Sequence, residues 1–349
     1  MKKVLLILPL LGLLPLTGCA QRSPASPPPV KGETVALVKS TESRHAMEDT
    51  FAWQLPRASW KLPFKDEQPI YFLSRTQNAT EWDRLPHFWN ETTEKAVDPA
   101  TGKEVERKAV KIKVPLGLTQ GPPIPAENPP TVARWRLGKQ LYFDPILSSD
   151  HTVRCATCHN PAKGWTDQRP VSVGIKNQKG GISAPTVLNS AYNALQFWDG
   201  RAVSLEHQCQ GPPQNPVEMF DGNGDAWRLV VERVRSQAGY RKQFQKAFGT
   251  EPTRDAIAKA IATYERTVLS GNSIHDRTEL AMRSRVEEEE TGKFEIKTKD
   301  YEKALKEAVA KKDVPALTAL GLDPEKDAAK LPAVAVSLNN GREIGRAHV

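Results

Sequence analysis

The sequence predicts a mainly α-helical fold that follows a loop-rich N-terminal extension, and three stretches carry this prediction. Residues 226–248 and 253–269 show the apolar spacing of amphipathic helices, and a further helix is expected to begin at Thr131. Residues 34–113 contain many aromatic side chains but no sustained periodicity. We therefore expect this extension to be mostly loop and to pack on a larger body.

Capping residues and apolar faces set the limits of the predicted helices. Thr253 can cap the helix of 253–269. The residues on its shared apolar face are Ile257, Ile261, Tyr264 and Val268. The helix that begins at Thr131 should stop at Asp144-Pro145, because proline disfavours continuation of a helix through the residue before it. Its inward-facing residues are Val132, Trp135 and Leu137.

The first 33 residues have the features of an export signal and a tether. Residues 1–18 combine a charged start with an apolar centre, as a secretory signal peptide does. Leu16-Thr17-Gly18-Cys19 resembles the bacterial lipoprotein box, in which the cysteine takes a lipid; the alternative is a plain signal peptide with an incidental Cys19. Residues 19–33 are rich in Pro and Ser and suit a tether. We expect an exported protein anchored through Cys19, with the outer membrane favoured because Asp does not follow Cys19.

Composition and charge exclude several classes of protein. The 349 residues are 39% hydrophobic and 26% charged, which indicates a globular chain of roughly two domains. After the first 20 residues no apolar run approaches the roughly 20 residues of a membrane-spanning helix. The 49 Lys and Arg exceed the 41 Asp and Glu but are spread along the chain, so no nucleic-acid partner is predicted.

Proline and charge runs suggest the domain limits. The proline-rich stretch 114–130 marks a boundary, and we place one helical domain at 114–280. Residues 281–349 begin with a charge-dense run that we interpret as a solvated helical or flexible insertion. Between these, Asp225 is expected to cap a helix, although residues 221–232 have part of the ligand spacing of a calcium loop.

The motif Cys155-Ala-Thr-Cys158-His159 carries the clearest chemistry. C-x-x-C-H is the attachment signature of c-type haem, in which the two thiols form thioethers and the histidine ligates the iron. The sequence therefore predicts one covalently bound haem c, and the export signal agrees because such haem is attached outside the cytoplasm.

A CxxC pair can also bind zinc, act as a redox pair or form a disulfide. Zinc needs two further ligands, and only His207 and Cys209 could supply them, without the usual paired spacing. A thioredoxin-type redox pair requires a βαβ setting, and a structural disulfide between such close residues would constrain almost nothing. Cys209 itself is either a small buried residue or a free thiol.

Three segments resemble the N-terminal haem domain of bacterial di-haem cytochrome c peroxidases and the related MauG-type oxidases. They are LGKQLYFDPILSSDHTVRCATCHNPAKGW, SAPTVLNSAYNALQFWDGRA and GPPQNPVEMF, within about a quarter of the chain. The resemblance implies a mostly helical, cytochrome c-like domain in which peroxide reacts at the N-terminal haem. It implies His159 as proximal ligand, Gln208 and Glu218 as a catalytic pair, and Trp198 as the tryptophan between the two haems.

These residue types suit peroxide chemistry. Cleavage of the peroxide O–O bond needs a group that moves a proton from one oxygen to the other, which Glu218 could do. The Gln208 amide could donate a hydrogen bond to developing charge, and Trp198 could pass electrons. Without the resemblance, a glutamate near a proline would be taken for a surface residue and a tryptophan for core.

The sequence departs from the family at three places. Many members have a distal histidine where this chain has Ile175, so we expect the iron to be permanently open to peroxide. Ser183 stands where many relatives have an asparagine calcium ligand, which leaves calcium binding open. The family needs a second CxxCH, which these four cysteines cannot form, so we expect a fragment that ends at the start of a C-terminal haem domain.

Taken together, these features predict a periplasmic, lipid-anchored peroxidase. It would reduce hydrogen peroxide to water with electrons from a small cytochrome c or cupredoxin. The alternatives are a MauG-type oxidase of a protein or organic substrate and a non-catalytic electron-transfer cytochrome c. A homodimer is left open.

Overall fold

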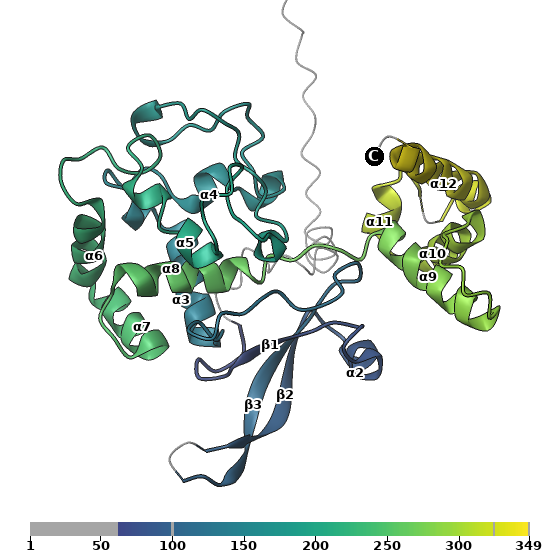
Figure 1. Cartoon of the computed structure of the whole chain (residues 1–349), viewed down its shortest axis with the longest axis horizontal. Coiled ribbons are helices and arrows are strands. Elements are labelled where there is room, and N and C mark those ends of the chain that lie inside the picture. Colours follow the sequence, from purple (N-terminus) through teal and green to yellow (C-terminus); the bar gives the residue numbers. More distant parts are fainter. Residues whose placement is uncertain (1–61, 99–100, 324, 348–349) are drawn as a thin grey trace, which may run out of the picture. The chain divides into compact units, whose positions relative to one another are not determined.

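The computed structural model describes residues 62–98, 101–323 and 325–347 (Figure 1). The predicted signal peptide, Cys19, the tether and residues 34–61 lie outside the described residues. Within the described part of the chain, no helix is both long and apolar enough to cross a membrane. The elements are β1 (Ile70–Leu73), α2 (Ala79–Arg84), β2 (Trp89–Val97), β3 (Glu104–Lys113), α3 (Val132–Phe143), α4 (Cys155–Cys158), α5 (Leu205–Gln208), α6 (Ala226–Ser236), α7 (Ala238–Phe248), α8 (Arg254–Glu265), α9 (Ile274–Glu288), α10 (Thr298–Ala310), α11 (Val314–Thr318) and α12 (Leu331–Ala347).

The extension contains a three-stranded sheet in the order β1-β3-β2. The central strand β3 runs parallel to β1, with Ile70 opposite Val110, and antiparallel to β2, with Trp89 opposite Ile112. The sequence analysis did not predict these strands. Charged pairs such as Arg107 with Glu94 link β2 and β3 across much of their length, so the apolar alternation that identifies a strand is confined to the end of β3.

The sheet packs on the helical body through aromatic side chains. Trp89 of β2 meets Trp135 of α3 with ring centroids 5.3 Å apart, in an edge-to-face arrangement. Trp135 is fully buried, and its indole nitrogen donates to the Thr267 hydroxyl over 2.9 Å. Phe88 of the extension is therefore part of the main core, and Trp89 packs against it.

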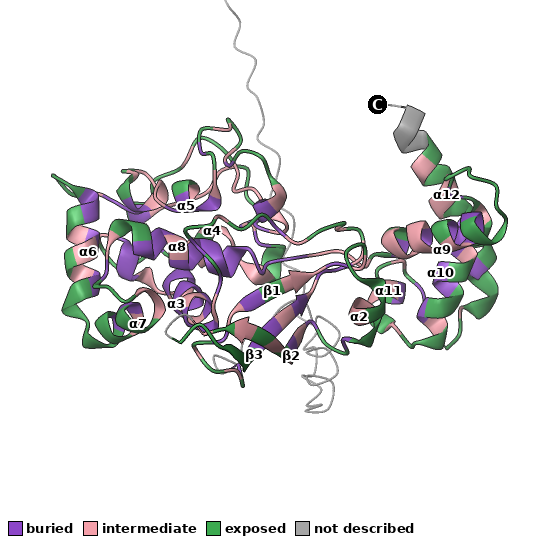
Figure 2. Cartoon of the chain, turned by 60° about the horizontal axis from the view of Figure 1, so that its bottom comes forward, coloured by how far each residue is buried: buried purple, intermediate pink, exposed green. Residues whose placement is uncertain are grey.

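The helical body is built on the crossing of α3 and α8, where buried residues concentrate (Figure 2). Gly138 permits this crossing, because a β-carbon there would lie 1.8 Å from the carbonyl oxygen of Ala260. The mainly α-helical class is confirmed. The residues predicted for the shared face of the second helix are all buried: Ile257, Ile261, Tyr264 and Val268.

Side-chain caps begin these helices as predicted. Thr131 and Thr253 cap α3 and α8 by accepting from the backbone N–H three residues on. The periodic stretch 226–248 forms two helices that meet at Gln237, whose backbone is extended. Asp225 caps the first of them, as expected, by accepting from the N–H groups of Trp227 and Arg228.

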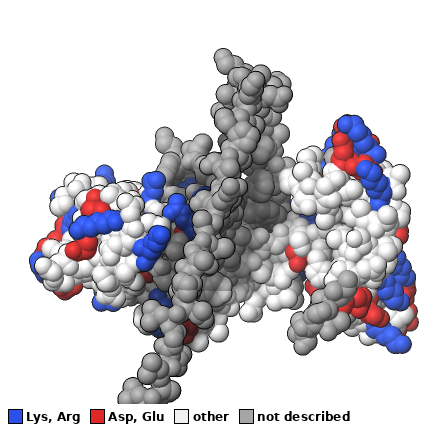
Figure 3. Space-filling view, turned by 90° about the horizontal axis from the view of Figure 1, so that it is seen from above, with Lys and Arg blue, Asp and Glu red and all other residues white. Residues whose placement is uncertain are grey.

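The charge-dense C-terminal segment forms helices with a core of their own. Helix α10 packs against both α9 and α12. Met282, Tyr301, Leu305 and Leu317 are buried in this second core, between the charged residues that suggested an insertion. On the face shown in Figure 3, acidic and basic side chains are interspersed over the described surface.

Candidate functional site

Most of the site residues predicted from the sequence line one cavity. It contains about 690 Å³ of space, part of which is open to solvent. Its walls come from the segment 153–159, the loop 172–180, the segment 208–219 and helix α8. Cys155, Cys158, His159, Gln208 and Glu218 all line it.

Helix α4 presents the two thiols. It is a single turn that begins at Cys155 and ends at Cys158, so the two side chains lie on the same side of the turn. Both cysteines are half-buried and free. Burial raises the pKa of both thiols, although the Ser172 hydroxyl partly opposes this at Cys158. Protonated thiols facing a cavity suit the attachment of a cofactor.

The ring of His159 is oriented by a backbone carbonyl. Its Nδ1 lies 3.0 Å from the carbonyl oxygen of Pro185, and because a carbonyl only accepts, Nδ1 must carry the proton. Burial lowers the pKa of His159 and favours the neutral ring. Nε2 is then left with a free lone pair, as in most histidines that ligate a metal.

These groups fit a covalently attached haem. Two thiols and an oriented imidazole with a free lone pair share one cavity wall, and the two thiols have the spacing that haem c requires. Apolar residues complete the walls, among them Leu147, Val153 and Met219.

Gln208 and Glu218 come to the cavity from α5 and from the loop after it. Gln208 is the last residue of α5, a short helix capped by Ser204, which accepts from His207 N–H over 3.1 Å. The Glu218 carboxylate accepts a 2.7 Å hydrogen bond from the Asn215 amide. Burial raises the pKa of Glu218, against the opposing charge of Arg201 and the bond from Asn215.

The segment 174–175 holds the backbone of Glu218. Ile175 is fully buried, and its N–H donates to the Glu218 carbonyl over 3.0 Å. A β-carbon on Gly174 would lie 2.1 Å from the carbonyl oxygen of Val217, so only glycine allows the two segments to approach this closely. Ile175 thus holds the backbone of Glu218 in place.

Trp198 lies apart from the cavity lining. Its side chain is 66% exposed, and its indole nitrogen donates to the Ser183 carbonyl over 3.0 Å. Within the described ranges, no three His, Cys, Asp or Glu side chains are grouped as metal ligands.

Two cavity residues were not assigned a role from sequence. Cys209 is buried, and its Sγ donates to Oε2 of Glu265 over 3.6 Å. Glu265 is the last residue of α8 and is 6% exposed. Burial raises the pKa of its carboxyl to about 7. Its spacing of four residues from the apolar Ile261 could have revealed it as a charged residue on a buried helix face.

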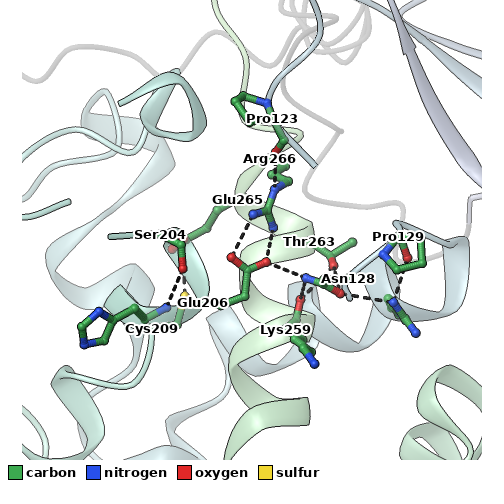
Figure 4. A network of polar contacts seen from close by, with 12 residues as sticks. Pro123, Asn128, Pro129, Ser204, Glu206, Cys209, Lys259, Thr263, Glu265 and Arg266 are labelled. Carbon is green, nitrogen blue, oxygen red and sulfur yellow. Dashed lines mark hydrogen bonds and ion pairs between the residues drawn. The ribbon is translucent and has the colours of Figure 1, made fainter. Parts of the chain in front are cut away.

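A buried polar network ties α5 to the end of α8 (Figure 4). The Arg266 guanidinium donates to both oxygens of Glu206, over 2.6 and 2.9 Å, and to the Pro123 carbonyl. Asn128 donates to Glu206 and to the Lys259 carbonyl. Burial acts to raise the pKa of Glu206, but the hydrogen bonds and charge of Arg266 outweigh it and hold this pKa below its ordinary value.

Comparison with known proteins matches the chain to one family. The family model of the di-haem cytochrome c peroxidases matches residues 132–284. Cytochrome c551 peroxidase of Nitrosomonas europaea is 44% identical over 156 residues, which are 44% of this chain and 46% of that protein. The methylamine utilization protein MauG of Methylorubrum extorquens is 38% identical over 197 residues, 56% of this chain and 55% of that protein.

One solved structure is also similar over part of the chain. A MauG-like protein associated with microbial copper homeostasis matches with a TM-score of 0.42 and 28% identity, covering 48% of this chain and 52% of the other. The chain spans about half the length of the curated relatives that it matches.

Proposed function

We propose that this chain belongs to the di-haem cytochrome c peroxidase family, whose model matches residues 132–284, and that it binds haem c in the cavity and reduces hydrogen peroxide to water. One observation carries this proposal. The oriented His159 shares a single cavity with the two thiols of its motif and with Gln208 and Glu218. When bound, haem supplies an iron at which peroxide can react and through which electrons can arrive.

The residues of this chain prepare the cavity for proton movement. Glu218 takes a proton from one peroxide oxygen and returns it to the other, a task for which its raised pKa is suited. Asn215 fixes its carboxylate by the 2.7 Å hydrogen bond. Gln208 donates an amide N–H toward the oxygen on which charge develops.

The proposed electron source is a small redox protein, a cytochrome c or a cupredoxin. Reduction of one peroxide to two waters consumes two electrons and two protons. Trp198 is proposed as an electron-transfer residue, and its exposed ring supports this role. A periplasmic location with a lipid on Cys19 completes the proposal and rests on the leader sequence.

A MauG-type oxidase of a protein or organic substrate is the second candidate. The match to MauG of Methylorubrum extorquens favours it, since it extends over more of the chain than the peroxidase matches do. A non-catalytic electron-transfer cytochrome c is disfavoured, because such a carrier gains nothing from Gln208 and Glu218 beside its cofactor. Steady-state rates with peroxide and with reduced cytochrome separate these functions.

Replacement of Glu218 tests the proposal. Glu218→Gln keeps the size of the side chain and its hydrogen bonding but removes the carboxylate, so peroxide reduction should slow about 10²-fold or more. Covalent haem content should stay the same, and the exposed Glu251→Gln should retain the wild-type rate. A wild-type rate in Glu218→Gln would reject the catalytic assignment.

A further inference from the structure

Glu265 is a buried carboxyl without a cation of its own. Among the described residues, the side chain of Glu265 has one hydrogen-bond partner, the Cys209 thiol. The neighbouring Arg266 is engaged elsewhere, because its guanidinium bonds both oxygens of Glu206 and the Pro123 carbonyl. A buried carboxylate with only a thiol donor is poorly compensated.

The comparison with Glu206 makes this clear. Both carboxyls are nearly inaccessible, with exposed fractions of 8% for Glu206 and 6% for Glu265. Arg266 pairs with Glu206 and keeps it ionised, whereas Glu265, among the described residues, accepts only the Cys209 thiol and burial raises its pKa. The surroundings shift the pKa values of the two carboxyls in opposite directions. In such pairs one carboxyl commonly stays ionised while the other gains and loses a proton.

Several elements place polar or titratable groups around Glu265. They are Tyr142 on α3, Cys155 on α4, Glu206 on α5, Cys209 directly after α5, and Tyr264 and Arg266 at the end of α8. Arg266 is the one cation among them, and it is paired. His159 and Glu218 line the same cavity.

We propose that Glu265 is a proton-exchange residue that takes up one proton when the cofactor in this cavity gains one electron. The inference rests on the proposed function, since it assumes haem bound at Cys155 and Cys158. The one-electron donor is the small redox protein, the proton comes from solvent, and the Glu265 carboxylate becomes a carboxylic acid. Reoxidation of the cofactor returns the proton.

Electrostatic attraction in the cavity links the uptake of an electron by the cofactor to the uptake of a proton by Glu265. An added electron makes the site more negative, and in a poorly hydrated interior this charge acts strongly on a nearby carboxylate. Glu265 lines the same cavity as Cys155, the first attachment thiol, so it is close to any cofactor bound there. Its pKa of about 7 allows both protonation states near neutral pH.

The midpoint potential of the purified haem protein, measured against pH, tests the inference. Between about pH 5 and pH 9 the wild-type potential should fall with pH, by at most about 59 mV per tenfold change in proton activity. Glu265→Gln should flatten this dependence, and Glu251→Gln should leave it unchanged. Cys209→Ala removes the donor that favours the carboxylate, so it should move the dependence to higher pH.

Infrared difference spectra of the wild type and of Glu265→Gln provide a second readout, which does not depend on the measured potential. Reduction should produce a protonated-carboxyl band that is absent from Glu265→Gln. A wild-type potential independent of pH, or a dependence that survives in Glu265→Gln, would overturn the inference.

The outcomes also separate this inference from the proposed function. A haem protein without peroxide turnover but with a potential that depends on Glu265 would reject only the peroxidase activity. A protein that attaches no haem would reject both.

Discussion

Ile175 provides no side-chain group that could ligate a metal. Its side chain cannot coordinate iron, and its N–H is committed to the Glu218 carbonyl. His207 lies on α5 next to Gln208 but is exposed, and its Nδ1 accepts from Val203 N–H over 3.4 Å. The side chain of Ile175 therefore offers no ligand, and His207 points to a backbone N–H.

The ferric protein should consequently show high-spin absorption as isolated, without prior reduction. Optical and electron paramagnetic resonance spectra at neutral pH measure this directly. A purely low-spin spectrum would contradict the expectation, and a His207→Ala variant would then show whether His207 had become the ligand.

Glu265 should also make the stability of the protein depend on pH. Its folded pKa of about 7 lies above the ordinary value of 4.5, so the folded state binds more protons between these values. The free energy of unfolding should therefore fall as pH rises from 4.5 to about 7, by up to about 3 kcal/mol. Denaturant unfolding should show a smaller fall in Glu265→Gln than in wild type, and an equal fall would contradict the assignment.

Site residues differ in how far the sequence reveals them. Cys155, Cys158 and His159 form a contiguous motif, and Gln208 and Glu218 could be assigned through the resemblance. The role of Glu265 depends on the ion pair between Arg266 and Glu206. This pair joins residues 60 positions apart in the sequence, so no local sequence pattern predicts it.

The crossing of α3 and α8 depends on one glycine. A β-carbon on Gly138 would lie 1.8 Å from the Ala260 carbonyl oxygen, which is backbone and cannot rotate away. Gly138→Ala should force the helices apart and destabilise the protein by about 1–3 kcal/mol or more. Thermal unfolding measures the effect, with the exposed Gly239→Ala on α7 as control because its β-carbon meets open space. Equal melting temperatures for the two variants would contradict the close-packed crossing.

Helices were predictable where local signals exist, and the sheet was not. Thr131, Thr253 and Asp225 mark the starts of helices. Each side chain accepts a hydrogen bond from a backbone N–H at most three residues further along the chain, so the signal is local. The strands β2 and β3 are matched by charge pairs between residues up to 17 apart, such as Glu91 and Lys108. The alternation of apolar and polar residues within one strand gives no sign of such pairing between strands.

At the scale of the whole molecule, the described residues divide into two hydrophobic cores. One core contains Trp135 and Tyr264 and underlies the cavity, while the other joins α9, α10 and α12. The family match covers the part of the first core that begins at Val132, leaves out its residues from the extension, such as Ile70 and Val110, and ends at residue 284, within α9. The function proposed for the cavity therefore depends on residues that share one core.

Mass analysis of the peptide that contains Cys155 and Cys158 tests the central claim most directly. The protein should be produced in a bacterial host that attaches haem to a control c-type cytochrome, and then digested. We expect this peptide to carry the mass of one haem, bound through both thiols, and Cys155→Ala/Cys158→Ala to carry none. Unmodified thiols in the wild-type peptide, with haem attached normally to the control, would contradict the account.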